Sequence, residues 1–179
     1  MKIAVTGAHR VGKTTLIEKI QESLPEYACN AEAYHELEET GLAFSEIPSP
    51  EDYIMLLEHS IKQITTRDDN VIFDRCPVDI LAYIQAAGEF KNFNIQPLYS
   101  RVQEVMPEID LLVFVPIEVP DLISCPESDL PELRQKVNDI LSGWVWDFNT
   151  NTIEVAGSPA ARRNQVINQM SKIQIPPQV

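Results

Sequence analysis

The feature that most constrains this 179-residue sequence is a glycine- and lysine-containing segment close to its amino terminus. Residues 7–14 read GAHRVGKT, the G-x-x-x-x-G-K-T spacing of a phosphate-binding P-loop, and a further threonine follows. Glycines let such a loop curl so that successive backbone N–H groups point at anionic oxygens. The lysine adds a positive charge, and the first threonine hydroxyl serves a magnesium ion that bridges the phosphates. The predicted nucleotide-binding residues of this loop are Gly7, Ala8, His9, Arg10, Val11, Gly12, Lys13, Thr14 and Thr15.

The residues on both sides place this loop between a strand and a helix. Before it, KIAVT (residues 2–6) is a short apolar run, and after it TLIEKIQESL (residues 15–24) has apolar residues at helical spacing. A P-loop requires this context because the helix directs the positive end of its dipole at the phosphates. The alternative, a glycine-containing turn with an exposed lysine, leaves these flanks unexplained. The side chains of His9 and Arg10 are assigned no chemical role.

The charge balance narrows the class of ligand. The sequence carries 27 acidic and 14 basic residues, a net charge of −13 at pH 7. This balance argues against a nucleic-acid polymer or an anionic membrane as partner, because no basic stripe is present to release counterions. An anionic ligand must therefore be held locally, by the few cations that belong to motifs.

Length and cysteine use indicate a single cytoplasmic domain. We assign residues 1–175 to one P-loop nucleotide-binding domain and 176–179 to a tail. Three cysteines without close spacing are typical of reduced thiols rather than of a disulfide frame or a zinc site. The first residue leads directly into a strand, which leaves no room for a signal peptide, and the most apolar stretch, LLVFVPI, is too short to span a bilayer. The oligomeric state stays open, a homodimer included.

Strands and helices are predicted to alternate along the chain. Continuously apolar strands in such an alternation indicate an α/β fold with a parallel sheet covered on both faces. Ligands of these sheets bind beyond the carboxyl ends of the strands, so the strand ends are where chemistry is expected. Ser49, followed by Pro50, and Pro77 are predicted helix starts. The predicted strands are KIAVT, YACNAEAY, NVIFDR, DLLVFVPI and TIEVAG.

Charged residues stand at several of these strand ends. Asp74 and Arg75 close the strand VIF, where the carboxylate could hold a magnesium-bound water and the guanidinium could clamp a phosphate or carboxylate. An ion pair at a strand end is the structural alternative. Asp79 is expected to complement the first turn of its own helix.

Two further residues are candidates with open alternatives. Glu32, near the end of the second predicted strand, is either a general base or an ordinary surface carboxylate. Arg134, at the start of a helix after a long loop, either swings over transferring phosphates or is a solvated surface arginine. His35 and His59 lack partners at metal-binding spacing.

Several segments, in chain order, resemble one known group of proteins. GAHRVGKTT, AEAYHEL, VIFDRCPVDILAYI, LPELRQKVNDIL and IEVAGSP look like the small bacterial P-loop proteins loosely called AAA-family ATPases. By fold these are similar to nucleoside and nucleotide kinases of the thymidylate-kinase and deoxynucleoside-kinase branch. The resemblance covers nearly the whole chain, and the P-loop is its most specific part.

The resemblance implies a three-layer P-loop NTPase fold with a five-stranded parallel sheet in the order 2-3-1-4-5 and a short lid at about residues 117–134. It also implies ATP and Mg²⁺ as cofactors and a small-molecule acceptor, bound between the helices that follow the second and third strands. By position, Thr14 and Asp74 match the metal-binding residues, and Lys13 the phosphate-binding lysine.

The remaining site residues are also carried over by position. Glu32 matches the acceptor-activating carboxylate, Asp74 and Arg75 the strand-end acid–arginine pair, and Arg134 the lid arginine. Gln63 falls near the position that reads a base edge. The turn expected to cradle the adenine by its backbone is formed by Gly157, Ser158, Pro159 and Ala160.

Departures from the family pattern bear on the acceptor. Thymidylate kinases usually carry an acidic residue inside the P-loop, and none stands between Gly7 and Gly12 here. The third strand ends in Asp-Arg-Cys rather than Glu-Arg-Ser, and the lid PESDLPELR is acidic with a single arginine. A phosphorylated acceptor such as a nucleoside monophosphate needs several cations, and this lid supplies only one arginine.

Two functions of different classes follow from these residues. The first is an ATP-dependent kinase that transfers the γ-phosphate to a nucleoside- or nucleotide-like acceptor, mostly by positioning and charge neutralisation. The second is an ATP-binding or ATP-hydrolysing switch, in which the nucleotide orders the lid for a partner protein. The absence of a guanine-reading N-K-x-D motif favours ATP over GTP.

Overall fold

A computed structural model of the chain describes residues 1–41, 44, 49–87 and 94–174. Its strands are β1 (Lys2–Thr6), β2 (Ala28–Asn30), β3 (Val71–Asp74), β4 (Leu111–Phe114) and β5 (Thr152–Glu154). The α-helices are α1 (Lys13–Ser23), α2 (Ala33–Glu39), α3 (Pro50–Thr66), α4 (Pro77–Ala86), α5 (Gln96–Val105), α6 (Pro131–Trp144) and α7 (Pro159–Gln174). Two short 3₁₀ helices are η2 (Met106–Glu108) and η3 (Glu127–Asp129). The tail predicted for residues 176–179 lies outside the described residues.

The five strands form one parallel sheet in the order β2-β3-β1-β4-β5, which confirms the predicted order. Central β1 pairs with β3, with Lys2 opposite Val71, and with β4, with Ile3 opposite Leu111. Because all strands run the same way, their carboxyl ends meet at one edge of the sheet. The P-loop, Asp74 and the turn after β5 therefore lie at the same end of the molecule.

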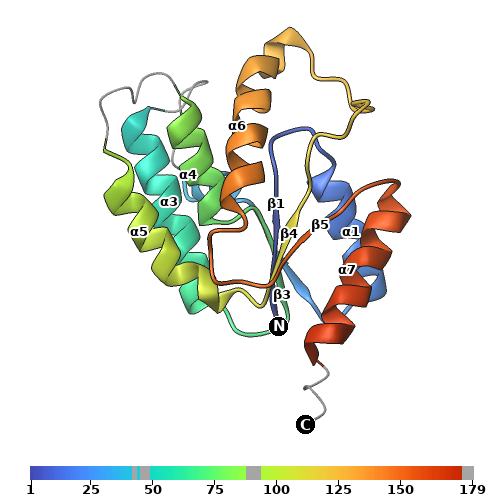
Figure 1. Cartoon of the computed structure of the whole chain (residues 1–179). Coiled ribbons are helices and arrows are strands. Elements are labelled where there is room, and N and C mark those ends of the chain that lie inside the picture. Colours follow the sequence, from blue (N-terminus) through green and yellow to red (C-terminus); the bar gives the residue numbers. More distant parts are fainter. Residues whose placement is uncertain (42–43, 45–48, 88–93, 175–179) are drawn as a thin grey trace.

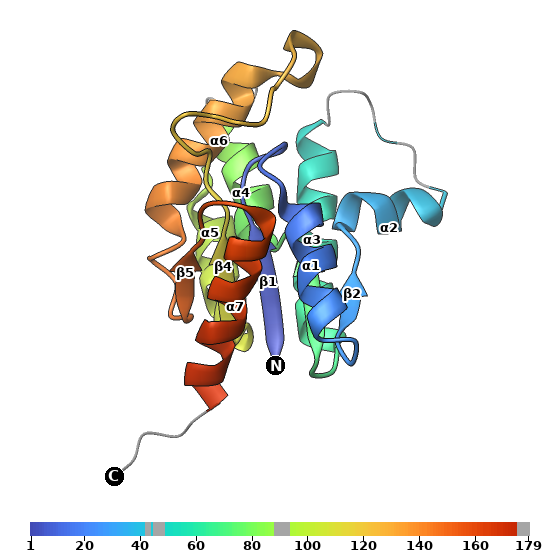
Figure 2. The same ribbon diagram turned by 90° about the vertical axis from the view of Figure 1, so that its right-hand side faces the viewer.

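Helices cover both faces of the sheet, as the apolar strands require (Figure 1). Helices α1 and α7 pack together on one face, and α3, α4, α5 and α6 pack on the other. Helix α2 follows β2, extends away from the sheet and packs against α3 (Figure 2). Strand residues such as Phe73 and Phe114 are fully buried between these layers. The three layers agree with the predicted α/β architecture.

Two of the predicted helix starts are confirmed. The Ser49 hydroxyl accepts a hydrogen bond from the Asp52 N–H at 3.2 Å, and the Asp52 carboxylate accepts one from the Ser49 N–H at 2.8 Å. This reciprocal capping box fixes the first turn of α3, with Pro50 at its first position. Helix α4 begins at Pro77, and Asp79 caps it by accepting from the Cys76 N–H at 2.9 Å.

The segment predicted as a lid, residues 117–134, connects β4 to α6. It runs as an irregular loop from the end of β4, contains η3, and continues into α6 at Pro131. Figure 1 shows it above the carboxyl ends of the strands. The described residues contain no helix with the length and hydrophobicity of a transmembrane segment. The three cysteines are free thiols, as their spacing predicts.

Candidate functional site

The P-loop occupies the turn between β1 and α1, the position predicted for it. Gly7 has a φ of 150°, and a Cβ added there would lie 2.4 Å from the Val115 carbonyl oxygen. Gly12 precedes α1 with a left-handed φ of 88°. Only glycine tolerates both the close approach at Gly7 and its backbone angle without strain. The two fixed glycines of the motif therefore have separate structural causes.

Lys13 is buried inside this loop, with 6% of its surface exposed. Its Nζ donates to the Ala8 carbonyl oxygen at 2.7 Å. Burial and then the charge of Arg75 lower its pKa from 10.5 to about 7, against the opposing effect of Asp79, Asp74 and Glu32. An anionic group in the loop would favour the charged form of this lysine.

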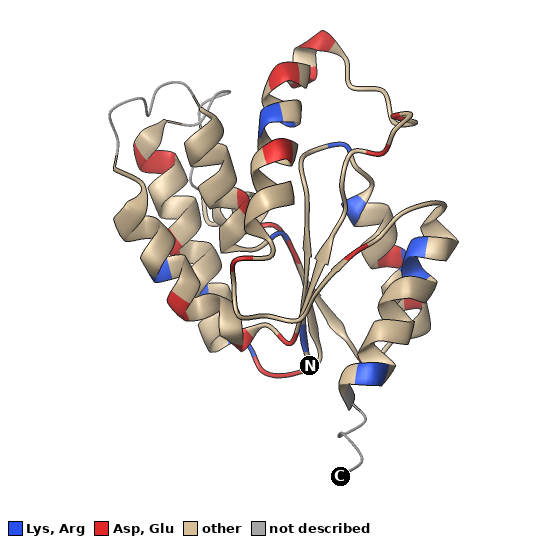
Figure 3. Cartoon of the chain, viewed as in Figure 1, with Lys and Arg blue, Asp and Glu red and all other residues tan. Residues whose placement is uncertain are grey.

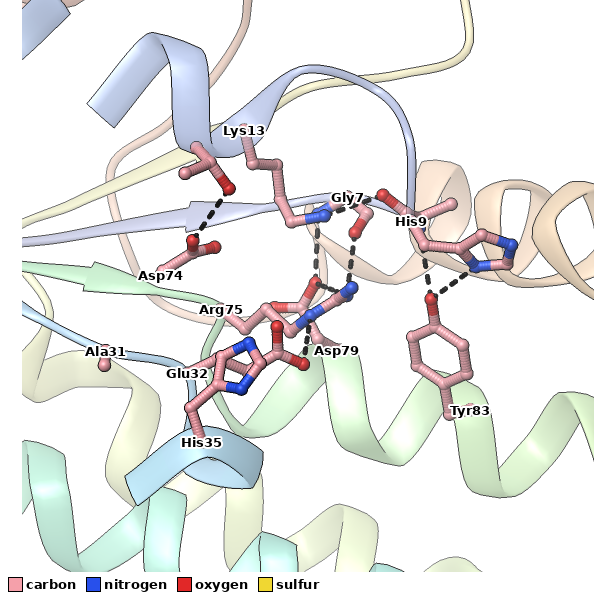
Figure 4. Close-up of polar contacts among 12 residues, drawn as sticks. Gly7, His9, Lys13, Ala31, Glu32, His35, Asp74, Arg75, Asp79 and Tyr83 are labelled. Carbon is pink, nitrogen blue, oxygen red and sulfur yellow. Dashed lines mark hydrogen bonds and ion pairs between the residues drawn. The ribbon is translucent and has the colours of Figure 1, made fainter. Parts of the chain in front are cut away.

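Asp74 and Thr14, the two residues predicted to hold a metal ion, are in contact beside the P-loop (Figure 4). The Thr14 hydroxyl donates to Asp74 Oδ2 at 3.2 Å, while the buried Asp74 Oδ1 has no hydrogen-bond partner. Burial raises the pKa of Asp74, although Lys13 and Arg75 oppose the rise. Oxygen ligands from one carboxylate and one hydroxyl suit Mg²⁺, which takes its other ligands from phosphates and water. No group of three His, Cys, Asp or Glu side chains among the described residues forms a metal-binding cluster.

Arg75 and Glu32 form a partly buried ion pair next to the loop (Figure 4). Arg75 Nε lies 2.7 Å from Glu32 Oε1, and Arg75 Nη1 donates to the Gly7 carbonyl oxygen at 3.1 Å. Burial alone would raise the pKa of Glu32, but Arg75, Lys13 and His35 together hold it below its ordinary value. Arg75 itself has a left-handed φ of 71°, a strained angle for this residue type. Glu32 is therefore an ionised carboxylate at neutral pH, held between β2 and α2.

Asp79 does more than complement its helix, which sequence reasoning did not predict. Its side chain is fully buried, and Oδ1 accepts from the Gly7 N–H at 2.9 Å. The same carboxylate lies 3.7 Å from Arg75 Nη1 and caps α4 through Cys76. Asp79 thus ties the first residue of the P-loop to α4. Asp79 follows Arg75 by four residues, which brings the two side chains together, but nothing in the sequence indicates that Asp79 is buried.

A cavity of about 400 Å³ opens beside the P-loop, between α2, α3, α4 and the lid. It is the space predicted for an acceptor, between the helices after the second and third strands. Gln63 does not line it, contrary to the resemblance-based expectation; its amide nitrogen donates to the Ala31 carbonyl oxygen at 3.2 Å. Ser60, one turn earlier on α3, faces the cavity instead. The lining includes Glu32, Tyr34, Tyr53, Leu56, Ser60, Asp74, Arg75, Ile80, Tyr83, Leu130 and Leu133.

His9 has contacts that the sequence did not predict. Its Nδ1 lies 2.9 Å from the Tyr83 hydroxyl, and its Nε2 lies 2.6 Å from the Asp129 carbonyl oxygen. Because a carbonyl oxygen only accepts, Nε2 carries the proton and Nδ1 accepts from Tyr83. Burial lowers the pKa of His9, and Arg75, Lys13 and Arg134 lower it further, against the hydrogen bond to Asp129. His9 therefore joins the P-loop, α4 and the lid at the wall of the cavity.

Arg134 is buried, with 5% of its surface exposed, which excludes a solvated surface arginine. Its Nε donates to the His9 carbonyl oxygen at 3.0 Å, and its Nη2 donates to the Arg10 carbonyl oxygen at 2.9 Å. Its Nη1 pairs with Asp121 of the lid. In this structure the guanidinium joins the lid to the P-loop backbone.

A second cavity, of about 390 Å³, lies on the other side of the loop. Gly157, Ser158 and Pro159 line it together with Gly12 and Thr15, so the turn predicted to cradle a base faces the P-loop. Arg162 also lines this cavity and was not predicted from the sequence, because two arginines in the run AARR are typical of a solvated helix face. The one feature that could have indicated Arg162 is that this run directly follows the turn after the last strand.

The sheet order, with a P-loop between the first strand and first helix, defines a P-loop NTPase with the nucleoside and nucleotide kinase fold. Residues 2–162 match the family model described as an AAA domain. The chain therefore belongs to this AAA-domain family.

Solved structures with this fold carry several kinase names. Deoxyadenosine kinase from M. mycoides has a TM-score of 0.66 at 18% identity, over 97% of this chain and 100% of that chain. Thymidylate kinase from Candida albicans has a TM-score of 0.63 at 16% identity, over 96% and 92%. Shikimate kinase from Acinetobacter baumannii, in complex with shikimate, has a TM-score of 0.62 at 15% identity, over 98% and 95%. At such identities the likeness establishes the fold. A comparison with curated protein sequences finds no match.

Proposed function

We propose that this protein transfers the γ-phosphate of Mg²⁺–ATP to a hydroxyl group of a small, uncharged, nucleoside-like acceptor. The observation that carries the proposal is the cavity beside the P-loop, at whose boundary Glu32, Asp74 and Arg75 stand together. The kinase names of the structures that share the fold support phosphoryl transfer as the reaction class.

The P-loop residues bind the nucleotide in this proposal. The loop amides and Lys13 hold the β- and γ-phosphates, and ATP supplies the transferred group. Thr14 and Asp74 hold Mg²⁺, which neutralises charge on the phosphates. The turn at residues 157–159 contacts the base through its backbone. Charge that develops during transfer is met by Lys13, by Arg75 and, through a movement of the lid, by Arg134.

Glu32 orients the acceptor hydroxyl. Its pKa is held below the ordinary value, so the ionised carboxylate can accept the hydroxyl proton. The ion pair with Arg75 fixes the direction of that carboxylate. Glu32 already offsets the charge of Arg75 in the resting site, so a neutral hydroxyl rather than a charged phosphate is the acceptor group that this part of the cavity suits.

The charges around the cavity favour an uncharged acceptor over a phosphomonoester. Of the arginines that line it in the described part of the chain, Arg10 pairs with Asp129 and Arg75 pairs with Glu32. The remaining walls are largely aromatic and aliphatic. A flat ring carrying hydroxyl groups fits such a cavity, whereas a phosphate would meet three carboxylates, those of Glu32, Asp74 and Asp129, without an unpaired arginine.

A screen of nucleosides, nucleoside monophosphates and other hydroxylated compounds with Mg²⁺–ATP tests the proposal, with the phosphorylated product detected by mass spectrometry. We expect product from an uncharged member of the panel. The substitution Glu32→Gln should lower kcat by roughly 100- to 10,000-fold, the range of a general base, and leave ATP affinity unchanged.

The matched control is Glu36→Gln, in the helix that Glu32 precedes, α2. Glu36 pairs with His59 and Arg67 and lies outside the cavity lining, so its loss should not change kcat. Equal turnover by Glu32→Gln and the unmodified protein would contradict the assigned role of Glu32.

The contacts between lid and loop favour a second function, an ATP-dependent switch. His9, Arg10 and Arg134 hold the lid against the P-loop in this structure, so a nucleotide entering the loop would alter the lid. Loss of ATP without any phosphorylated acceptor across the whole panel would favour this function over the kinase.

A further inference from the structure

Five successive backbone carbonyls of the P-loop each accept a hydrogen bond from a positively charged side chain. The donors are four residues that come from α1, α6, α7 and the turn before α4. The pairs are Gly7 with Arg75 Nη1 (3.1 Å), Ala8 with Lys13 Nζ (2.7 Å), His9 with Arg134 Nε (3.0 Å), Arg10 with Arg134 Nη2 (2.9 Å) and Val11 with Arg162 Nη1 (2.7 Å).

These contacts have a direct consequence for the inside of the loop. The N–H groups of Gly7 and His9 donate to the Asp79 carboxylate and the Tyr83 hydroxyl. With the carbonyls held by the cations, the remaining N–H groups of the loop can converge on an anion. Each carbonyl also brings a partial negative charge, which a hydrogen-bonded guanidinium or ammonium group offsets. The loop is thus shaped for phosphate by cations that lie around it.

Arg162 differs from the other three donors. Lys13 is the residue that would turn to the phosphates, Arg75 belongs to the acceptor cavity, and Arg134 belongs to the lid. Arg162 comes from α7, which packs beside α1 on the face of the sheet opposite to α4 and α6, and only 7% of it is exposed. It has no place in the kinase roles assigned above.

The second contact of Arg162 connects the loop to the base side of the site. Its Nη2 lies 3.1 Å from Glu118 Oε1, just after β4, and the Gly157 N–H donates to the same carboxylate oxygen. Its Nη1 would lie 3.3 Å from a Cβ on Gly12, so the guanidinium packs directly against the loop. One planar group therefore joins Val11, the end of β4 and the turn after β5.

We infer that Arg162 is a positioning residue of the nucleotide site, which sets the conformation of the P-loop by holding the Val11 carbonyl and does not itself read the base. This inference rests on the proposed binding of Mg²⁺–nucleotide and is independent of the phosphoryl acceptor. If Arg162 acts only through the loop that holds the phosphates, it must contribute equally to the affinity for a nucleotide and for a polyphosphate that has no base.

The test measures binding of Mg²⁺–ATP by calorimetry and of magnesium tripolyphosphate by displacement of a fluorescent ATP analogue. Arg162→Ala should weaken both ligands by roughly 10- to 100-fold, the range for loss of a hydrogen bond to a charged group. Arg162→Lys should recover part of that loss, because an ammonium group can reach one of the two partners but cannot span both.

Arg163→Ala is the matched control. It removes the same charge from the neighbouring position of α7, but Arg163 Nη1 donates to Ser23 Oγ at 2.7 Å, at the far end of α1 from the loop. Its affinity for both ligands should stay within about twofold of the unmodified protein, because the charge of Arg163 is held at the end of α1 away from the loop, where salt screens its effect on the phosphates.

The possible results separate the inference from the proposed function. Unchanged affinity of folded Arg162→Ala, or a loss confined to ATP with tripolyphosphate unaffected, would overturn the positioning role. Should Arg162→Ala fail to fold, Arg162→Lys decides: weakened binding of both ligands supports the inference, and unchanged binding overturns it. An unmodified protein that binds no Mg²⁺–ATP would instead show that the proposed function is wrong.

Discussion

At the scale of single residues, the P-loop restricts which residue can stand at position 7 both by the space available for a side chain and by the backbone angle. Gly7 combines a φ of 150° with a carbonyl oxygen 2.4 Å from where a side chain would begin. We expect Gly7→Ala to lower the free energy of unfolding by roughly 2–4 kcal/mol, since neither the strand end nor Val115 can give way. Denaturant unfolding measures the change.

Gly143→Ala provides the comparison for that measurement. Gly143 lies in α6, and a Cβ there would meet nothing within 4 Å. Alanine in a helix is favoured over glycine, and at this position in the last turn of α6 the variant should gain up to about 1 kcal/mol. If both alanine variants shift stability in the same direction, the account of the loop glycine is wrong.

The free energy of unfolding is expected to depend on pH through His9. Its pKa is lowered from the ordinary 6.5, first by burial, so the folded protein binds fewer protons at this residue than the unfolded chain does. Stability linked to His9 is therefore full above pH 6.5 and is lost as pH falls through the lowered pKa. The groups that face it are Tyr83, Asp129, Arg75, Lys13 and Arg134.

The measurement compares the protein with His9→Asn, which cannot titrate. The difference in unfolding free energy between the two should decrease from pH 7.5 to pH 5, because protonated His9 would lose the hydrogen bond accepted from Tyr83 at Nδ1. A difference that stays constant across this range would contradict the assignment of a neutral, buried His9.

At the scale of elements, the start of α3 carries a testable share of stability. Ser49→Ala removes the hydroxyl that accepts from the Asp52 N–H, and should cost about 1 kcal/mol. Ser171→Ala, in the exposed part of α7, removes only a hydrogen bond to the Ile167 carbonyl and should stay within about 0.5 kcal/mol. Equal losses in thermal unfolding would show that the capping box does not stabilise α3.

Most elements could be predicted from local sequence chemistry. The proline-led helix starts at Pro50 and Pro77 and the apolar strand at 111–114 were identified because their signals act within a few residues. The sheet order came from the resemblance, since no local pattern encodes which strands become neighbours. Glu32 was predicted at the end of the second strand, but that strand ends earlier, at Asn30, and Glu32 stands at the residue before α2.

The long-range contacts of the site could not be predicted in the same way. Arg162 reaches Val11 across 151 positions of the chain, and Asp79 reaches Gly7 across 72. Such pairs depend on how α7 and α4 pack on the sheet, and a charged residue in a helix is typically solvated. Gln63 shows the converse. Its helix was predicted correctly, but Ser60, three residues earlier, lines the cavity, while Gln63 donates to the Ala31 carbonyl oxygen.

At the scale of the whole molecule, the few cations are concentrated where they affect the loop. The net charge is −13, and acidic positions gather on the lid and at the start of α6 (Figure 3). Four of the 14 basic residues, Lys13, Arg75, Arg134 and Arg162, donate to P-loop carbonyls. A local anion site can therefore exist in a strongly acidic protein, because these contacts act at hydrogen-bond distance and are little screened.

Calorimetric titration of the protein with ATP, with and without Mg²⁺, is the most direct test that this loop binds a nucleotide. We predict one site per chain that requires Mg²⁺ for full affinity, and a loss of about 100-fold or more in Lys13→Ala, because the variant lacks the buried ammonium group proposed to hold the phosphates. Absence of binding by the unmodified protein, or equal affinity of Lys13→Ala, would contradict it.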